Sequence, residues 1–165
     1  MKPIDSTIEI LIWKHFGESV NENWIQWAVD MMMAGFDTEH LVELAGIDKP
    51  YNQFELAELT DKVFDELGLD FKDEDRVVIG YATFVVKQVL LGKRDLLKSL
   101  KQLSKLCIDT DYNQIIYDFY LLYYAKEDLR YSEMQWYWDG ADRENIDQIC
   151  LDRFRKWIED YDSQQ

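Results

Sequence analysis

Two histidines, His15 and His40, are the first side chains to consider for metal binding or acid–base chemistry. Di-iron sites in helical bundles combine carboxylates with two Glu-x-x-His pairs on facing helices. Residues 39–43 read Glu-His-Leu-Val-Glu, in which the histidine precedes the glutamate at helical spacing, the reverse of the di-iron order. Leu11, one helical turn before His15, is apolar and offers no carboxylate. His-Glu-x-x-His and Cys/His clusters of zinc spacing are absent from the sequence. We therefore expect no metal ion and no other cofactor, and interpret both histidines as satisfied or surface side chains.

Residues 70–75 (Asp-Phe-Lys-Asp-Glu-Asp) superficially resemble a calcium loop. An EF-hand needs oxygen ligands at alternate positions, glycine at the sixth position and glutamate at the twelfth. Counting from Asp70 puts Lys72 third and Asp75 sixth, and counting from the next aspartate puts Val77 fifth. The acids instead predict a helix N-terminus, where they face the positive end of the helix dipole.

Catalytic motifs are also missing. The sequence has no Gly-x-Ser-x-Gly, no P-loop and no Gly-x-Gly-x-x-Gly. With 33 acidic residues among 165, carboxylate pairs arise by chance and are interpreted as solvated faces. We expect a protein that is not an enzyme. The alternative is a helical enzyme or small-ligand-binding protein whose polar pocket uses scattered carboxylates.

Aromatic side chains are concentrated in the C-terminal half, in five tyrosines between residues 112 and 124 and in the run Trp136-Tyr137-Trp138-Asp139. These exceed what one face of each segment can bury. Tyrosine and tryptophan outside a core are favoured at protein interfaces. Trp136, Tyr137, Trp138 and Asp139 are therefore the predicted partner-binding residues; alternatively, the rings form the wall of a core.

Apolar residues recur at spacings of three and four along most of the chain, which indicates amphipathic helices. Ser19 and Asn52 are each followed by a glutamate three residues later, the spacing of a capping box, and are predicted to be N-caps. Residues 77–86 are rich in β-branched side chains and could form a strand, but a lone strand would leave backbone groups unsatisfied, so a helix is predicted. The predicted helices span residues 6–16, 21–34, 37–45, 52–67, 73–91, 93–106, 111–125, the less regular 127–140, and 142–161.

These segments predict an all-α fold, a compact bundle of about eight or nine helices arranged as antiparallel hairpins. No linker or low-complexity tract interrupts residues 1–165, so a single helical domain is expected. Cys107 and Cys150 form no motif and are expected to be buried and reduced. Asp5 and Glu9 interrupt any signal-peptide core, and the longest uncharged run is half a membrane span, so we expect a cytoplasmic, soluble protein without membrane contact.

The formal net charge of −15 argues against direct nucleic-acid binding, which depends on cationic side chains. Residues 1–75 hold 18 acids and 5 bases, whereas residues 76–105 hold 1 acid and 7 bases. The basic stripe could contact an anion, although easing the repulsion between acidic neighbours explains it better. Mimicry of DNA by the acidic face is a further alternative. The stripe consists of Lys93, Arg94, Lys98, Lys101 and Lys105.

Four short segments carry a resemblance to known proteins: residues 24–28 (Trp-Ile-Gln-Trp-Ala), 35–37 (Gly-Phe-Asp), 41–46 (Leu-Val-Glu-Leu-Ala-Gly) and 52–55 (Asn-Gln-Phe-Glu). Together they resemble small helical bacterial proteins of uncharacterised function, some of which look like immunity proteins that neutralise a toxin. The resemblance covers residues 24–59 and carries over no functional residue. It implies a small cytosolic helical protein and raises a toxin as a candidate partner. The expected function is thus a non-catalytic, acidic protein-binding module with a basic protein partner.

Overall fold

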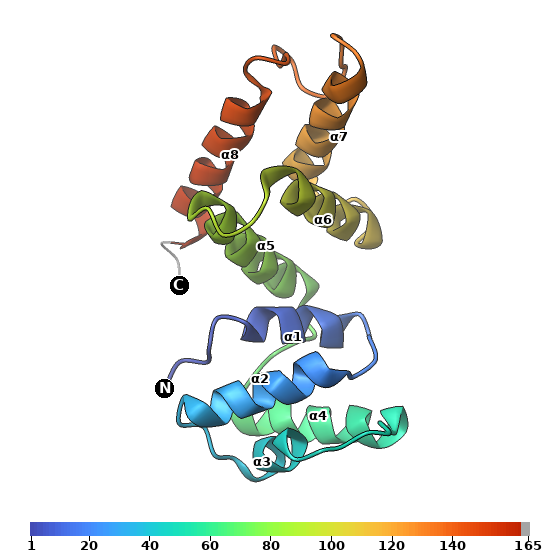
Figure 1. Cartoon of the computed structure of the whole chain (residues 1–165), viewed down its shortest axis with the longest axis vertical. Helices are drawn as coiled ribbons and strands as arrows, with labels where there is room; N and C mark the ends of the chain where they lie inside the picture. The colour runs from blue at the N-terminus through green and yellow to red at the C-terminus, as the bar shows by residue number, and fades with distance from the viewer. Residues whose placement is uncertain (163–165) are drawn as a thin grey trace. The chain divides into compact units, whose positions relative to one another are not determined.

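The structure, a computed structural model, describes residues 1–162, and within them it is all-α (Figure 1). The all-α prediction and the expected number of about eight or nine helices are confirmed. The helices are α1 (Thr7–His15), α2 (Glu22–Met33), α3 (Glu39–Ala45), α4 (Gln53–Leu67), α5 (Glu74–Leu90), α6 (Leu96–Asp109), α7 (Tyr117–Tyr131) and α8 (Ile146–Tyr161). Residues 77–86 lie within α5, so the choice of helix over strand is correct.

Contacts between Cα atoms divide the chain into two compact units. Unit 1 is Met1–Val77 and contains α1 to α4, and unit 2 begins at Val78 and contains α6 to α8 with most of α5. The predicted single domain stays a prediction, and each unit is described by itself.

Unit 1 is built on the apolar faces of four helices. Its buried cluster includes Trp24, Trp27 and Met31 of α2 together with Val63 and Phe64 of α4. Two polar connections join elements far apart in the sequence. The Lys14 ammonium pairs with the Asp61 carboxylate at 2.8 Å, which ties α1 to α4. The Gln53 side chain accepts the N–H of Val20 at 2.8 Å and donates to its carbonyl at 2.9 Å.

Unit 2 has its own set of buried side chains, with aromatic rings from two helices in contact. Phe119 of α7 lies 5.3 Å from Phe154 and 5.1 Å from Trp157 of α8, measured between ring centroids. The indole N–H of Trp157 donates to the Thr83 hydroxyl of α5 at 3.0 Å. Arg153 of α8 donates to Asp118 at 2.8 Å, which adds a polar link between α8 and α7.

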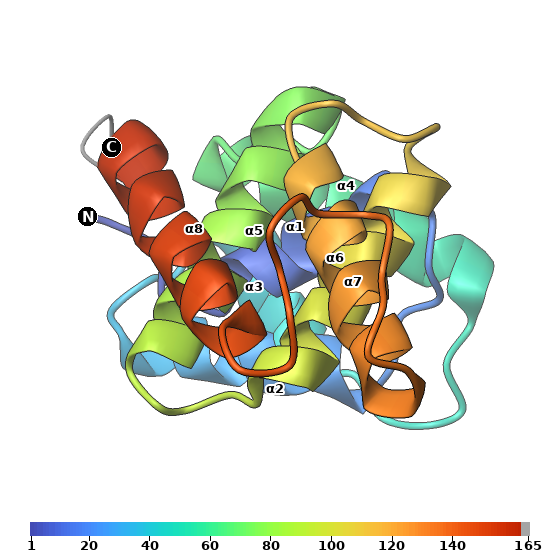
Figure 2. The same cartoon turned by 90° about the horizontal axis from the view of Figure 1, so that it is seen from above.

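The connections show where the sequence-based boundaries were wrong. The predicted helix 111–125 starts six residues early, because Asp111 and Tyr112 adopt positive φ angles of 55° and 57° and only Tyr117 begins α7. The predicted helix 127–140 does not exist as such. Residues 127–131 complete α7, and residues 132–145 form a non-helical connection to α8. Figure 2 shows this connection passing from the end of α7 to the start of α8.

Some helix starts, those of α2, α4 and α6 among them, have a side chain that accepts a backbone N–H group. Asn52 caps α4 as predicted, accepting the N–H of Glu55 at 3.2 Å. At α2 the cap is Asn21, which accepts the N–H of Asn23 at 2.9 Å, and not the predicted Ser19. Both cysteines are buried and free, as predicted.

Candidate partner-binding surface

The four predicted partner-binding residues lie together in the connection between α7 and α8, which we call the 132–145 loop (Figures 1 and 2). Trp136 is 83% exposed and Tyr137 is 39% exposed. Trp138 is half-buried, and Asp139 is exposed. The loop therefore offers one whole indole ring to solvent and keeps a second one partly packed.

The Gln135 side chain holds the backbone of the loop around Trp136. Its carbonyl oxygen accepts the N–H groups of Tyr137 and Trp138, each at 2.8 Å. Its amide group donates to the carbonyl oxygens of Trp138 at 2.5 Å and Ala141 at 3.1 Å. The Gln135 side chain thus satisfies backbone N–H and carbonyl groups that would be paired with each other in a helix. Gln135 was not among the predicted residues, because a single glutamine carries no pattern in the sequence.

The far end of the loop is closed by a second set of hydrogen bonds. The Asp142 carboxylate accepts the N–H groups of Glu144 and Asn145, each at 2.9 Å. The Asn145 amide donates to the Gly140 carbonyl at 2.9 Å, and the Arg143 Nε donates to the Leu129 carbonyl of α7 at 2.8 Å. Hydrogen bonds consequently order the loop backbone, and this ordered backbone carries the exposed Trp136 ring.

Six tyrosines form a continuous set of ring contacts in unit 2, which we call the tyrosine cluster. Tyr120 lies at its centre, 5.5 Å from Tyr112, 5.4 Å from Tyr117 and 4.9 Å from Tyr124. Tyr124 lies 5.6 Å from Tyr137, which joins the cluster to the 132–145 loop. Tyr123 completes the cluster, 5.0 Å from Tyr124.

Burial and the neighbouring phenols raise the pKa of Tyr120 above its ordinary value. Burial is also the largest cause of the raised pKa of Tyr123, with Glu127 adding to it. Like tyrosines of ordinary pKa, both phenols are protonated at neutral pH and can donate hydrogen bonds to a partner. The cluster offers flat apolar area with hydroxyl groups, the combination enriched at protein interfaces.

The charges on the loop are mostly negative. Its only cation is Arg143, against four carboxylates. Those carboxylates belong to Glu133, Asp139, Asp142 and Glu144, all exposed. An exposed ring on a loop that also carries four exposed carboxylates is complementary to a surface that carries lysine or arginine around an apolar depression.

The basic stripe lies partly on α6, where Lys98, Lys101 and Lys105 are all exposed. A groove of about 350 Å³ lies between Lys101 and Lys105 of α6 and Tyr123 and Tyr124 of α7. Lys105 pairs with Asp109 at 2.6 Å, which shows one of these charges being neutralised within its own helix.

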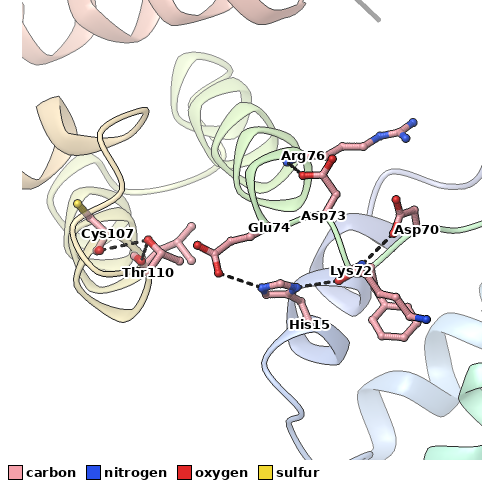
Figure 3. Close-up of polar contacts among 10 residues, drawn as sticks. His15, Asp70, Lys72, Asp73, Glu74, Arg76, Cys107 and Thr110 are labelled. Carbon is pink, nitrogen blue, oxygen red and sulfur yellow. Dashed lines mark hydrogen bonds and ion pairs between the residues drawn. The ribbon is translucent and has the colours of Figure 1, made fainter.

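Both histidines are held by partners distant in sequence, as Figure 3 shows for His15. His15 Nδ1 lies 2.8 Å from the Phe71 carbonyl oxygen, and Nε2 lies 3.4 Å from a Glu74 carboxylate oxygen. His40 Nδ1 contacts the Glu66 carboxylate, which also accepts the His40 backbone N–H at 3.1 Å. These contacts agree with the interpretation of both histidines as satisfied side chains.

Glu39, His40 and Glu66 bring three possible metal-ligand atoms within 4.8 Å of one another. The hydrogen bond from His40 lowers the pKa of Glu66, which favours its ionised form. The Glu66 carboxylate thereby satisfies a first-turn N–H of α3, where a negative charge is favourable. Helix capping accounts for the contact between His40 and Glu66, which spacing along the sequence could not reveal because Glu66 lies on α4.

The acidic segment 70–75 behaves as a helix start, as predicted. Asp70 accepts the N–H of Lys72 at 2.8 Å, and Asp73 accepts the N–H of Arg76 in the first turn of α5 at 3.2 Å (Figure 3).

No model of a known protein family, no curated protein and no solved structure matches the chain. Among the described residues, no helix combines the length and the apolar character that crossing a bilayer requires.

Proposed function

We propose that this chain is a non-catalytic, acidic protein-binding module that contacts a basic protein through the 132–145 loop and the adjoining tyrosine cluster. The observation that carries the proposal is Trp136, an indole ring 83% exposed at the centre of a hydrogen-bonded loop. Tryptophan is the residue type most enriched at binding hot spots, and an ordered support lowers the entropy lost on binding.

Charge supports the basic character of the partner. The net charge of −15 would accelerate encounter with a cationic protein, and this acceleration would weaken as salt rises. In its specific form, the proposal is a cytoplasmic bacterial immunity protein whose partner is a basic toxin. This form rests on the resemblance of residues 24–59.

The test is co-purification from native lysate at low and high salt, followed by binding measurements with the identified partner. Replacing Trp136 by alanine should weaken the complex by about 2 kcal/mol or more, the cost of a hot-spot truncation. Tyr131→Ala is the matched control, because Tyr131 is also exposed, at 76%, but lies outside the loop and the tyrosine cluster. Helicity measured by circular dichroism should be the same in both variants.

Undiminished binding by the Trp136 variant would contradict the proposed surface, and an acidic partner would contradict the charge argument.

The double variant Trp136→Ala with Trp138→Ala extends the test. Trp138 is half-buried, so its removal should also lower stability. In the immunity form of the proposal, the reading frame next to the gene for this chain encodes the toxin. Expression of that neighbouring frame alone should stop cell growth, and co-expression of this chain should restore it.

A further inference from the structure

The groove between α6 and α7 occupies about 350 Å³, a volume that accommodates a small molecule. It lies within unit 2, and the lining that the structure describes contains no carboxylate. Most of the lining comes from one helix, and the tyrosines come from the other. The lining residues are Lys101, Gln102, Ser104, Lys105, Ile108, Tyr123 and Tyr124.

Ser104 supplies the observation that indicates a ligand in this groove. The residue is only 2% exposed, and its hydroxyl forms no hydrogen bond within the described part of the chain. Buried threonine hydroxyls on neighbouring helices do have partners, since Thr60 and Thr83 donate to carbonyl oxygens of their own helices at 2.9 Å and 2.7 Å. Buried polar groups in proteins are normally paired. An unpaired hydroxyl at the wall of a groove is therefore available to a ligand that can accept a hydrogen bond.

The side chains beside Ser104 add further donors. The Gln102 carbonyl oxygen accepts Nη1 of Arg94 at 3.3 Å, which leaves the amide N–H groups of Gln102 for a ligand. Lys101 is exposed, and its ammonium group forms no ion pair with a described residue. Lys105 is already paired with Asp109 and is not counted as an available charge.

An isoleucine and two tyrosine rings form the apolar part of the lining. Ile108 is 40% exposed, and Tyr123 and Tyr124 are both half-buried. The two rings lie 5.0 Å apart between centroids and are nearly perpendicular, at 74°. A ligand ring can pack on such a surface in the edge-to-face geometry that aromatic groups prefer.

From this combination we infer that the α6–α7 groove binds a small organic anion, a carboxylate or phosphate group attached to an aromatic ring. The anionic group accepts hydrogen bonds from Ser104, Gln102 and Lys101, and the ring lies against Ile108 and the two tyrosines. Hydrogen bonds to a charged acceptor are about twice as strong as those between neutral groups. The described lining disfavours a cation, because it offers an unpaired ammonium group and no carboxylate. This ligand site is additional to the proposed partner surface.

Titration calorimetry with phenylacetate, on the full chain at low salt, tests the inference. The neutral phenylacetamide has the same ring and is the matched probe without charge. We expect phenylacetate to bind and phenylacetamide to bind at least about tenfold more weakly, because only the carboxylate gains charge-assisted hydrogen bonds. Equal binding of the two probes, or no heat with phenylacetate at millimolar concentration, would overturn the site.

The double variant Lys101→Gln with Ser104→Ala removes the available charge and the unpaired hydroxyl. Its affinity for phenylacetate should fall at least about tenfold. Lys98→Gln with Ser99→Ala is the matched control, because Lys98 is also exposed and Ser99 is also 2% exposed on α6, yet neither lines the groove. An equal loss in the two double variants would refute the site. If either double variant fails to fold, the single surface variants Lys101→Gln and Lys98→Gln provide the same comparison.

Two further probes identify the anionic group. Phenyl phosphate carries a ring on a phosphate, and inorganic phosphate has no ring. Tighter binding of phenyl phosphate than of phenylacetate would support a phosphate monoester as the ligand, and the reverse order would support a carboxylate. Inorganic phosphate that binds as tightly as phenyl phosphate would refute the apolar half of the site. These measurements use no protein partner, and Trp136 does not line the groove, so failure of this site and failure of the proposed function are separately visible.

Discussion

Indole N–H groups at buried positions have different partners in this protein. Trp27 and Trp157 each donate to a threonine hydroxyl at 3.0 Å, whereas the buried Trp24 Nε1 has no hydrogen-bond partner among the described residues. Replacing one of these threonine acceptors therefore leaves another buried indole N–H unsatisfied. The cost of such a group is set by lost solvation and not by the mean value of a hydrogen bond.

Thr83→Val removes the acceptor of the Trp157 N–H while keeping the shape of the side chain. The free energy of unfolding, measured with urea, should fall by about 1–3 kcal/mol. Thr110→Val is the control, because the Thr110 hydroxyl donates only to backbone carbonyls and its loss leaves no buried indole N–H unpaired. An equal loss in the two variants would contradict the argument.

Burial raises the pKa of the Cys150 thiol from 9.0 to about 12, with a smaller contribution from Asp147. The unfolded thiol ionises first as pH rises, so the unfolded state binds fewer protons and stability falls between pH 9 and about 12. Denaturant titrations across this interval should show a shallower fall for Cys150→Ala than for the native chain. At pH 8 the native thiol should react with a disulfide reagent far more slowly than the unfolded one.

At the scale of elements, the 132–145 loop depends on one side chain. Gln135→Ala removes the four hydrogen bonds between its amide and the loop backbone. We expect rapid proteolytic cleavage within residues 132–145 without change in far-ultraviolet circular dichroism, since the helices do not include this segment. Gln148→Ala on α8 is the control, because its amide donates to the Asp152 carboxylate and not to the loop. Equal cleavage of the two variants would disprove the role of Gln135.

The start of α6 offers a second element-scale prediction. Asp95 accepts the N–H of Lys98 at 2.9 Å, so Asp95→Ala should cost about 1 kcal/mol of unfolding free energy. Ser6 precedes α1 in the same position but makes no capping hydrogen bond, so Ser6→Ala should change stability little. Urea unfolding of the two variants makes the comparison, and a larger loss for Ser6 would contradict it.

At the scale of the whole molecule, the net charge of −15 opposes folding through repulsion between carboxylates. Raising NaCl from about 0.02 M to about 0.5 M shortens the screening length and should raise the thermal midpoint by about 2–4 °C. A non-ionic solute of equal osmolality is the control, because it leaves the charges unscreened. A midpoint that falls with salt would mean that attractive ion pairs dominate.

The features that could be predicted are those that depend on residues close together in the sequence. The spacing of apolar residues specified helices over most of the described chain, and even the β-branched segment 77–86 was assigned correctly, because no partner strand exists for it among the predicted elements. The boundaries near residues 111 and 132 were wrong. There the backbone follows positive φ angles at Asp111 and Tyr112 and the side-chain bonds of Gln135, which leave no periodic signal.

The sequence by itself determined the fold class, the acidity and the aromatic run at 136–138, since these follow from composition and periodicity. Only the tertiary structure decided that Trp136 is exposed while Trp138 is half-buried, and that Lys101 and Tyr124 line one groove. The reason is that burial and juxtaposition depend on which helix faces meet. Residues as far apart as 101 and 124 share a groove only because α6 and α7 pack together.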